Sequence, residues 1–123
     1  MNYHNITKDD MLNGDGLRTV LWVSGCNHHC KNCQNPQTWS KDSGIPFDFD
    51  TLFEIWNQLD KSYISGITFS GGDPLFPDNR EIVCAISALI KDCHPTKTQW
   101  IYTGYKWEEI KDLPIMEYID VVV

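Results

Sequence analysis

Short apolar segments alternate with amphipathic segments along the chain, and this alternation limits the folds available to it. Residues 17–23 (LRTVLWV) and 64–70 (ISGITFS) are rich in β-branched residues, as buried strands are. Residues 99–102 and 120–123 have the same character. Helix-like segments lie between these strands, and this order predicts parallel strands joined by right-handed crossovers. We therefore expect an α/β fold.

Three helices are expected between the strands. The first opens at Thr51, because Thr51 and Glu54 form a Thr-x-x-Glu capping box. Asp78 and Glu81 form a similar box near the start of the second helix, and Trp107 begins a third, short one. The apolar residues expected to face the core recur at helical spacing: Leu52, Ile55, Trp56 and Leu59, then Ile82, Ile86, Leu89 and Cys93.

The rest of the chain has the composition of loops. The first 16 residues are polar and end in Asn-Gly-Asp-Gly, which predicts an extended arm or loop. Residues 34–46 are rich in Asn, Ser, Gly and Pro and predict a second loop. A length of 123 residues predicts a single domain spanning residues 1–123. Because Val123 falls inside an apolar strand, we expect that domain to be truncated at its C-terminus.

The charge balance narrows the class of partner. Ten Lys and Arg residues against 17 Asp and Glu give a net charge of −7. Affinity for nucleic acid comes mainly from basic side chains, so we expect no nucleic-acid partner. The chain also lacks an apolar run long enough to span a bilayer and the charged-then-apolar pattern of a signal peptide. We expect no membrane association and a cytoplasmic location.

Cysteine spacing points to a metal centre. Three of the five cysteines, Cys26, Cys30 and Cys33, lie within eight positions, whereas Cys84 and Cys93 stand apart on the second helix. In a cytosolic chain such a cluster indicates a metal or redox site rather than disulfides. A structural zinc site takes four protein ligands, and the neighbouring histidines at 28 and 29 leave that alternative open. Three thiolates with an open corner fit a [4Fe–4S] cluster better.

The unusual motifs all follow predicted strands. The cysteines come after the first strand, Gly71-Gly72-Asp73-Pro74 after the second, and Thr103-Gly104-Tyr105 after the third. Ligands of parallel α/β proteins gather at the carboxyl ends of strands. The sequence therefore predicts one site formed by three loops.

The Cys-x3-Cys-x2-Cys motif resembles the signature of the radical S-adenosylmethionine (SAM) enzymes. The segments NGDGLRTVLWVSGC, CQNPQTW, SGGDP and WIYTGYKWEEI, in that order, resemble the glycyl-radical-enzyme activating proteins of that family, in particular those of the anaerobic ribonucleotide reductase. The resemblance covers nearly the whole chain. It implies an abbreviated, open radical SAM (β/α) partial barrel with parallel strands, and an oxidoreductase activity.

The resemblance also implies the cofactors and the residues that bind them. A [4Fe–4S] cluster held by Cys26, Cys30 and Cys33 would cleave SAM reductively to a 5′-deoxyadenosyl radical. The residues that the resemblance places around SAM are Asn32, Cys33 and Gln34 beside adenosine, Gly71, Gly72 and Asp73 at the methionine ammonium, and Thr103 near the ribose and carboxylate.

The implied partners are the large subunit of the anaerobic ribonucleoside-triphosphate reductase, on which a glycyl radical would be generated, and an electron donor such as flavodoxin. Three alternatives stay open at this point. The chain could activate another glycyl radical enzyme such as pyruvate formate-lyase, modify a small molecule, or be a non-catalytic zinc module that binds a protein.

Overall fold

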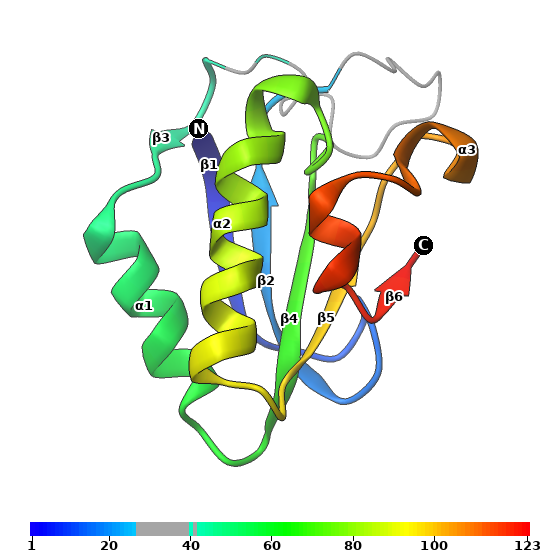
Figure 1. The fold of residues 1–123 in the computed structure, drawn as a ribbon. Coiled ribbons are helices and arrows are strands. Elements are labelled where there is room, and N and C mark those ends of the chain that lie inside the picture. The colour runs from blue at the N-terminus through cyan, green and yellow to red at the C-terminus, as the bar shows by residue number, and fades with distance from the viewer. Residues whose placement is uncertain (27–39, 41) are drawn as a thin grey trace.

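The structure is a computed structural model and describes residues 1–26, 40 and 42–123. In those residues one mixed sheet is flanked by helices (Figure 1). The elements in chain order are β1 (Asn2–Asp10), β2 (Leu17–Val23), β3 (Ile45–Pro46), α1 (Phe49–Leu59), β4 (Ile64–Gly71), α2 (Pro77–Cys93), β5 (Thr98–Ile101), α3 (Trp107–Ile110), the 3₁₀ helix η2 (Pro114–Glu117) and β6 (Val121–Val122).

The strand order confirms the α/β class and corrects the expectation that the strands are all parallel. Across the sheet the order is β3-β1-β2-β4-β5-β6. Strands β2, β4, β5 and β6 are parallel to one another, as predicted. β1 is antiparallel to β2, and β3 is antiparallel to β1. The fold is therefore α/β with a mixed sheet.

The expected N-terminal arm or loop is confirmed only for residues 11–16, because residues 2–10 form β1. This strand lacks a regular apolar alternation: Ile6 is its only buried residue, and two irregularities interrupt its register with β2. Backbone pairing to β2 holds it in place, assisted by a hydrogen bond of 2.6 Å from the Trp22 indole N–H to Thr7 Oγ1. Backbone pairing does not require apolar residues at alternate positions, so the sequence pattern does not indicate this strand.

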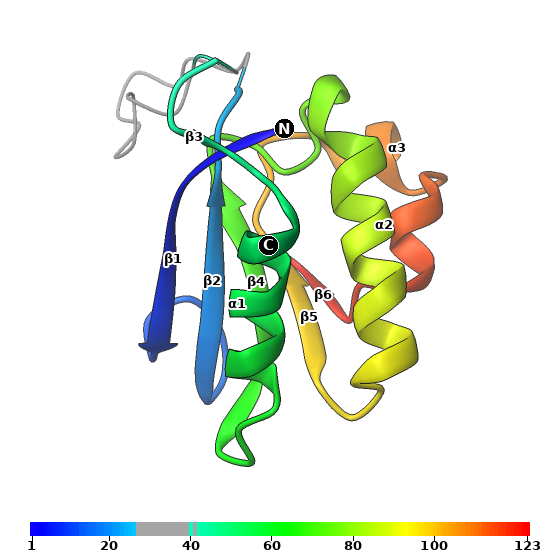
Figure 2. The same ribbon diagram turned by 90° about the vertical axis from the view of Figure 1, so that its left-hand side faces the viewer.

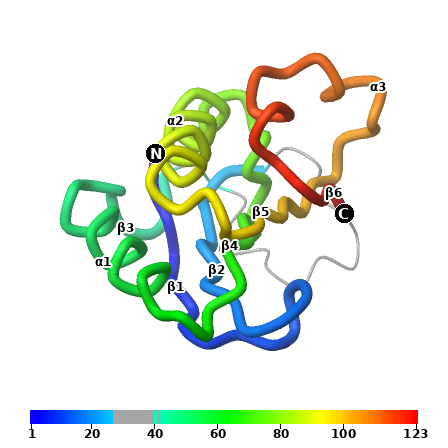
Figure 3. Tube along the Cα trace, turned by 60° about the horizontal axis from the view of Figure 1, so that its bottom comes forward, coloured from blue at the N-terminus to red at the C-terminus, as the bar shows by residue number. Residues whose placement is uncertain are grey.

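The core lies between the sheet and the two long helices. Leu21, Phe69 and Ile101 occupy matching positions on β2, β4 and β5 and are fully buried. They belong to one apolar cluster with Ile55 of α1 and Val83 of α2. Figures 2 and 3 show α1 and α2 side by side on the same face of the sheet. None of the described helices is long and apolar enough to cross a membrane.

Both helix starts differ from the predicted capping boxes. Asp48, not Thr51, caps α1: its carboxylate accepts hydrogen bonds from the Thr51 N–H and hydroxyl at 3.0 and 2.9 Å, and these bonds lower the pKa of Asp48. Helix α2 begins at Pro77 with no side-chain cap, so the box at Asp78 is wrong. Proline at the first helical position leaves one fewer N–H group in need of an acceptor, and its fixed φ suits the start of a helix.

The buried face of α2 is also shifted from the expected one. Two stripes at helical spacing overlap on this helix, and the core uses the one that contains Val83 and Ile90. Ile86 belongs to both stripes and is buried, as expected. Ile82 and Leu89, expected in the core, are instead exposed.

Arg18 joins the amino-terminal halves of three neighbouring strands. Its guanidinium is buried, and Nε donates to Thr68 Oγ1 at 2.9 Å. Nη1 donates to Thr98 Oγ1 at 2.7 Å and to the Asp15 carbonyl at 3.2 Å. Nη2 donates to the carbonyls of Ile67 and Thr98 at 2.8 and 2.7 Å. The planar, forked shape of this side chain is what allows one group to reach β4 and β5 together.

The position next to the Arg18 guanidinium, Gly66 on β4, has no space for a side chain. A Cβ atom at Gly66 would collide with the Thr98 carbonyl oxygen and lie 2.7 Å from Arg18 Nη2. Burial lowers the pKa of Arg18 to about 10, against the opposing effect of Asp120 and Asp15. The guanidinium therefore remains charged at neutral pH.

We predict that Arg18→Met lowers the free energy of unfolding by about 3 kcal/mol or more, because buried carbonyl and hydroxyl oxygens on β4 and β5 lose their donor. Arg18→Lys should cost less, about 2 kcal/mol, since an ammonium keeps the charge but not the fork. Urea unfolding followed by circular dichroism under anaerobic conditions measures both. A lysine variant as stable as the wild type would show that the fork is not required.

Candidate functional site

Three loops meet where the parallel strands end, as the sequence predicts. The loop after β4 is bonded to the end of β2: Gly72 N–H donates to the Val23 carbonyl at 2.8 Å, and Asp73 N–H donates to the Gly25 carbonyl at 2.7 Å. The same loop is bonded to the turn after β5 through Asp73 and Thr103. Within the described residues, the start of the loop after β2, the loop after β4 and the turn after β5 therefore form one connected unit.

Cys26 lies at this junction. It lies three residues after the end of β2 and is 8% exposed. A cysteine at this place can, on losing its proton, bind an iron–sulfur cluster or another soft metal site. Cys30 and Cys33, together with the predicted SAM contacts Asn32 and Gln34, lie outside the described residues. In the described part of the chain no three His, Cys, Asp or Glu residues form a metal site.

The carboxylate of Asp73 fixes the third loop. Oδ1 and Oδ2 accept hydrogen bonds from the Thr103 hydroxyl at 2.9 and 3.0 Å, and Oδ2 accepts another from Gly104 N–H at 2.9 Å. Oδ1 also accepts from Leu75 N–H at 2.9 Å. Asp73 is 1% exposed. Two residues that the sequence predicts as separate SAM contacts are therefore bonded to each other, and Asp73 acts as a positioning residue.

Gly71 is needed for the close approach of β4 to β2. Its φ is +104°, and a Cβ atom there would lie 2.5 Å from both the backbone N and O of Val23. The N–H of Gly72 is already donated to Val23. An ammonium group needs acceptors, so the carbonyl oxygens of this loop, rather than its N–H groups, are suited to bind one.

Asn79 is a site-building residue that the sequence reasoning missed. It is 2% exposed in the first turns of α2, and its side-chain amide donates to the carbonyls of Ser24 and Asp73 at 2.7 and 3.2 Å. Helix α2 thereby holds the end of β2 and the loop after β4 (residues 71–74) together. The available signal was its spacing, since Asn79 precedes Val83 by one turn on the buried face.

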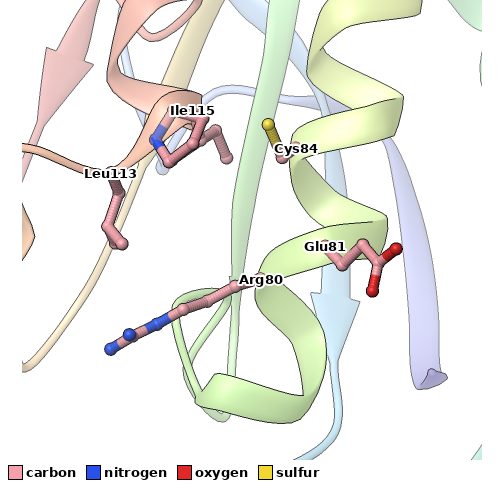
Figure 4. Close-up of a pocket in the computed structure, with 6 residues that line it drawn as sticks. Arg80, Glu81, Cys84, Leu113 and Ile115 are labelled. Atoms are coloured by element: carbon pink, nitrogen blue, oxygen red, sulfur yellow. The ribbon is translucent and has the colours of Figure 1, made fainter.

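The two remaining cysteines lie elsewhere on α2. Cys84 lines a cavity of about 350 Å³ with Arg80, Leu113 and Ile115, and Figure 4 shows it across that cavity from Ile115. Burial raises the pKa of the Cys84 thiol, and the charge of Glu117 adds to this effect. A protonated thiol is a poor metal ligand.

Cys93, expected to be buried in the apolar stripe, is exposed. The shift in the buried face of α2 accounts for this difference, because Cys93 belongs to the stripe that the core does not use. That Cys84 and Cys93 do not bind the metal stays a prediction.

Comparison with known proteins identifies the family to which the chain belongs. A family model described as "4Fe-4S single cluster domain" matches residues 12–123. This match favours an iron–sulfur cluster over the zinc alternative.

Three relatives carry the same name, "Anaerobic ribonucleoside-triphosphate reductase-activating protein". The protein of Enterobacteria phage T4 is 45% identical over 123 residues, which are 100% of this chain and 79% of the relative. Those of Haemophilus influenzae and Escherichia coli K12 are each 40% identical, over 127 and 128 residues, with 100% of this chain and 82% of each relative covered. The chain belongs to the family of anaerobic ribonucleoside-triphosphate reductase-activating proteins.

Proposed function

We propose that this chain is an iron–sulfur activase that generates a glycyl radical on the anaerobic ribonucleoside-triphosphate reductase. Its family membership supports this function. The structural observation that carries it is the meeting of Cys26, the Gly71–Asp73 loop and Thr103 at one edge of the sheet. That edge is where parallel α/β proteins bind ligands.

The chemistry comes from the cofactors, and the chain supplies their binding and orientation. When bound and reduced, a [4Fe–4S] cluster would supply the one electron needed to cleave SAM to methionine and a 5′-deoxyadenosyl radical, and that radical would supply the abstraction of a hydrogen atom from a backbone glycine of the reductase. Cys26, Cys30 and Cys33 would hold the cluster and leave one iron for the amino and carboxylate groups of SAM.

The residues around SAM have distinct roles in this proposal. The carbonyl oxygens of Gly71 and Gly72 accept hydrogen bonds from the methionine ammonium. Asp73 holds Thr103 at the ribose and carboxylate side through the hydrogen bonds at 2.9 and 3.0 Å. Asn32, Cys33 and Gln34 would line the adenosine side.

The finer architecture and the cellular setting also belong to this proposal. The sheet with open edges, and with α1 and α2 on one face, supports an open, partial radical SAM barrel within a single domain (Figure 3). The partner is the large subunit of the reductase, the electron donor is a protein such as flavodoxin, and the reaction takes place in the cytoplasm without nucleic acid or membrane.

The decisive experiment follows the radical itself. Reduced, reconstituted protein is incubated with SAM and the reductase without oxygen, and electron paramagnetic resonance is recorded. We expect a doublet that collapses when the reductase contains 2-deuterated glycine, because the coupling arises from the remaining α-hydrogen. A product formed at full rate from a small molecule, with no reductase present, would contradict the proposal.

We predict that replacing Cys26, Cys30 or Cys33 by alanine abolishes the cluster, because a site with three thiolates has no spare ligand. Cys84→Ala and Cys93→Ala are matched controls and should retain the iron and sulfide of the wild type. Iron and acid-labile sulfide per chain are measured after anaerobic reconstitution. Equal iron loss in Cys84→Ala and Cys30→Ala would overturn the ligand assignment.

We also predict that Asp73→Asn weakens SAM binding by roughly tenfold while the cluster still assembles. The amide keeps the size of the carboxylate but turns an NH₂ group toward the hydroxyl and N–H donors of the loop after β5. Titration of SAM against the reduced cluster by electron paramagnetic resonance gives the affinity. Asp112→Asn, an exposed change, is the control, and wild-type affinity in Asp73→Asn would remove Asp73 from the positioning role.

A further inference from the structure

An apolar groove lies between α1 and α2, on the side of these helices that the sheet does not cover. Its volume is about 410 Å³. Figures 1 and 2 show the two helices next to each other along this face. The groove is lined mainly by apolar side chains from both helices and from the residue two positions before α1: Phe47, Phe49, Leu52, Ile82, Ala85 and Leu89.

The apolar side chains along the groove are exposed to a degree that the fold does not require. Phe49, which lines the groove, is 78% exposed, and Phe53, one turn further along α1, is 60% exposed. Ile82 and Leu89 of α2 are 40% and 45% exposed. A contiguous exposed apolar surface of this kind marks an interaction site. The second apolar stripe of α2, which the core does not use, therefore has a separate role.

Among the residues that the structure describes, the exposed charges that we place beside the groove are acidic. Asp48 is one of its lining residues. On α2, Asp92 follows Leu89 by three positions and so lies on the same side of the helix. Arg80 is turned away and lines the cavity on the other side of α2 (Figure 4). Lys91 follows Cys84 by seven positions and shares that far side. Helix α1 contains no basic residue.

This charge pattern selects among possible occupants. In a symmetric contact with a second copy, the same acidic rim would meet itself, and like charges across an interface are unfavourable. An anionic lipid surface meets the same objection. An amphipathic helix with an apolar stripe flanked by Lys and Arg complements both the apolar floor and the acidic rim.

We propose that this groove docks a basic amphipathic segment of the reductase, an inference that rests on the proposed function. The groove adjoins the site. Ile82 lies one turn after Asn79, whose side chain holds the carbonyls of Ser24 and Asp73 at the loop junction. Docking here raises the effective concentration of the substrate glycine at the site without contributing to the chemistry.

The first test removes the apolar contacts. Ile82→Ala/Leu89→Ala should weaken binding of the reductase by about tenfold or more, because central apolar anchors dominate the binding free energy. The matched control is Met11→Ala/Leu12→Ala, which truncates two apolar side chains that are 74% and 90% exposed in the loop after β1. Binding of immobilised reductase is measured anaerobically by surface plasmon resonance.

The second test removes the acidic charges. Asp78 precedes Ile82 by four positions and so lies, like Asp92, on the groove side of α2. Asp78→Asn/Asp92→Asn should slow association by about threefold and flatten its dependence on salt, because rim charges act mainly on the association rate. Asp112→Asn/Glu117→Gln removes two exposed charges outside these helices and should leave both unchanged. Asp48 is left intact because it caps α1.

Further measurements separate failure of this inference from failure of the proposed function. Cleavage of SAM by the chemically reduced protein without partner, and iron content, should be the same in Ile82→Ala/Leu89→Ala and the wild type. If the wild type neither binds the reductase nor forms its radical, the proposed function fails and this inference with it.

If the wild type binds and activates the reductase, and the apolar variant binds within twofold of it, only the groove is excluded. A wild-type dimer in light scattering that the apolar variant dissociates would identify the groove as a self-interface and also overturn the inference.

Discussion

The buried carboxylate of Asp73 is the constraint on which the arrangement of the site depends. It draws together donors from the loop after β5, while its own backbone N–H is bonded to the Gly25 carbonyl beside Cys26. A charged group 1% exposed is stable only when hydrogen bonds replace its lost water. The loops must therefore stay close to one another for the fold to tolerate Asp73, and the same closeness forms the site.

Arg18 has the corresponding role near the other end of the strands. Its hydrogen bonds go to neutral oxygens on β4, β5 and the loop before β2, and it stacks on Trp100 at 5.4 Å from the ring centroid. A cation held by several neutral acceptors depends on all of them being in place, so it fixes the relative position of the strands. Because the strands are fixed relative to one another, their carboxyl ends at the site are fixed as well.

The sequence made the parallel strands and their converging loops predictable, because β-branched runs and glycine-rich turns are local signals. β1 was not predictable in this way, since an edge strand with one buried residue is held by backbone pairing. The start of α1 was missed because Asp48 and Thr51 are both good caps, and the backbone conformation selects Asp48. The bond between Asp73 and Thr103 joins residues 30 positions apart, and no local pattern reports such a pair.

The two apolar stripes of α2 illustrate the limit of periodicity most directly. Both have helical spacing, yet only one faces the sheet, and the choice follows from Asn79 and Ser87: Asn79 must reach the carbonyls at the site, and the Ser87 carbonyl accepts a bond of 3.1 Å from Gln99 on β5. These polar contacts fix the rotation of the helix and leave the other stripe in water. A net charge of −7 opposes self-association through that exposed surface. The same polar bonds that build the site thus also leave an apolar surface next to it, available to a partner of opposite charge.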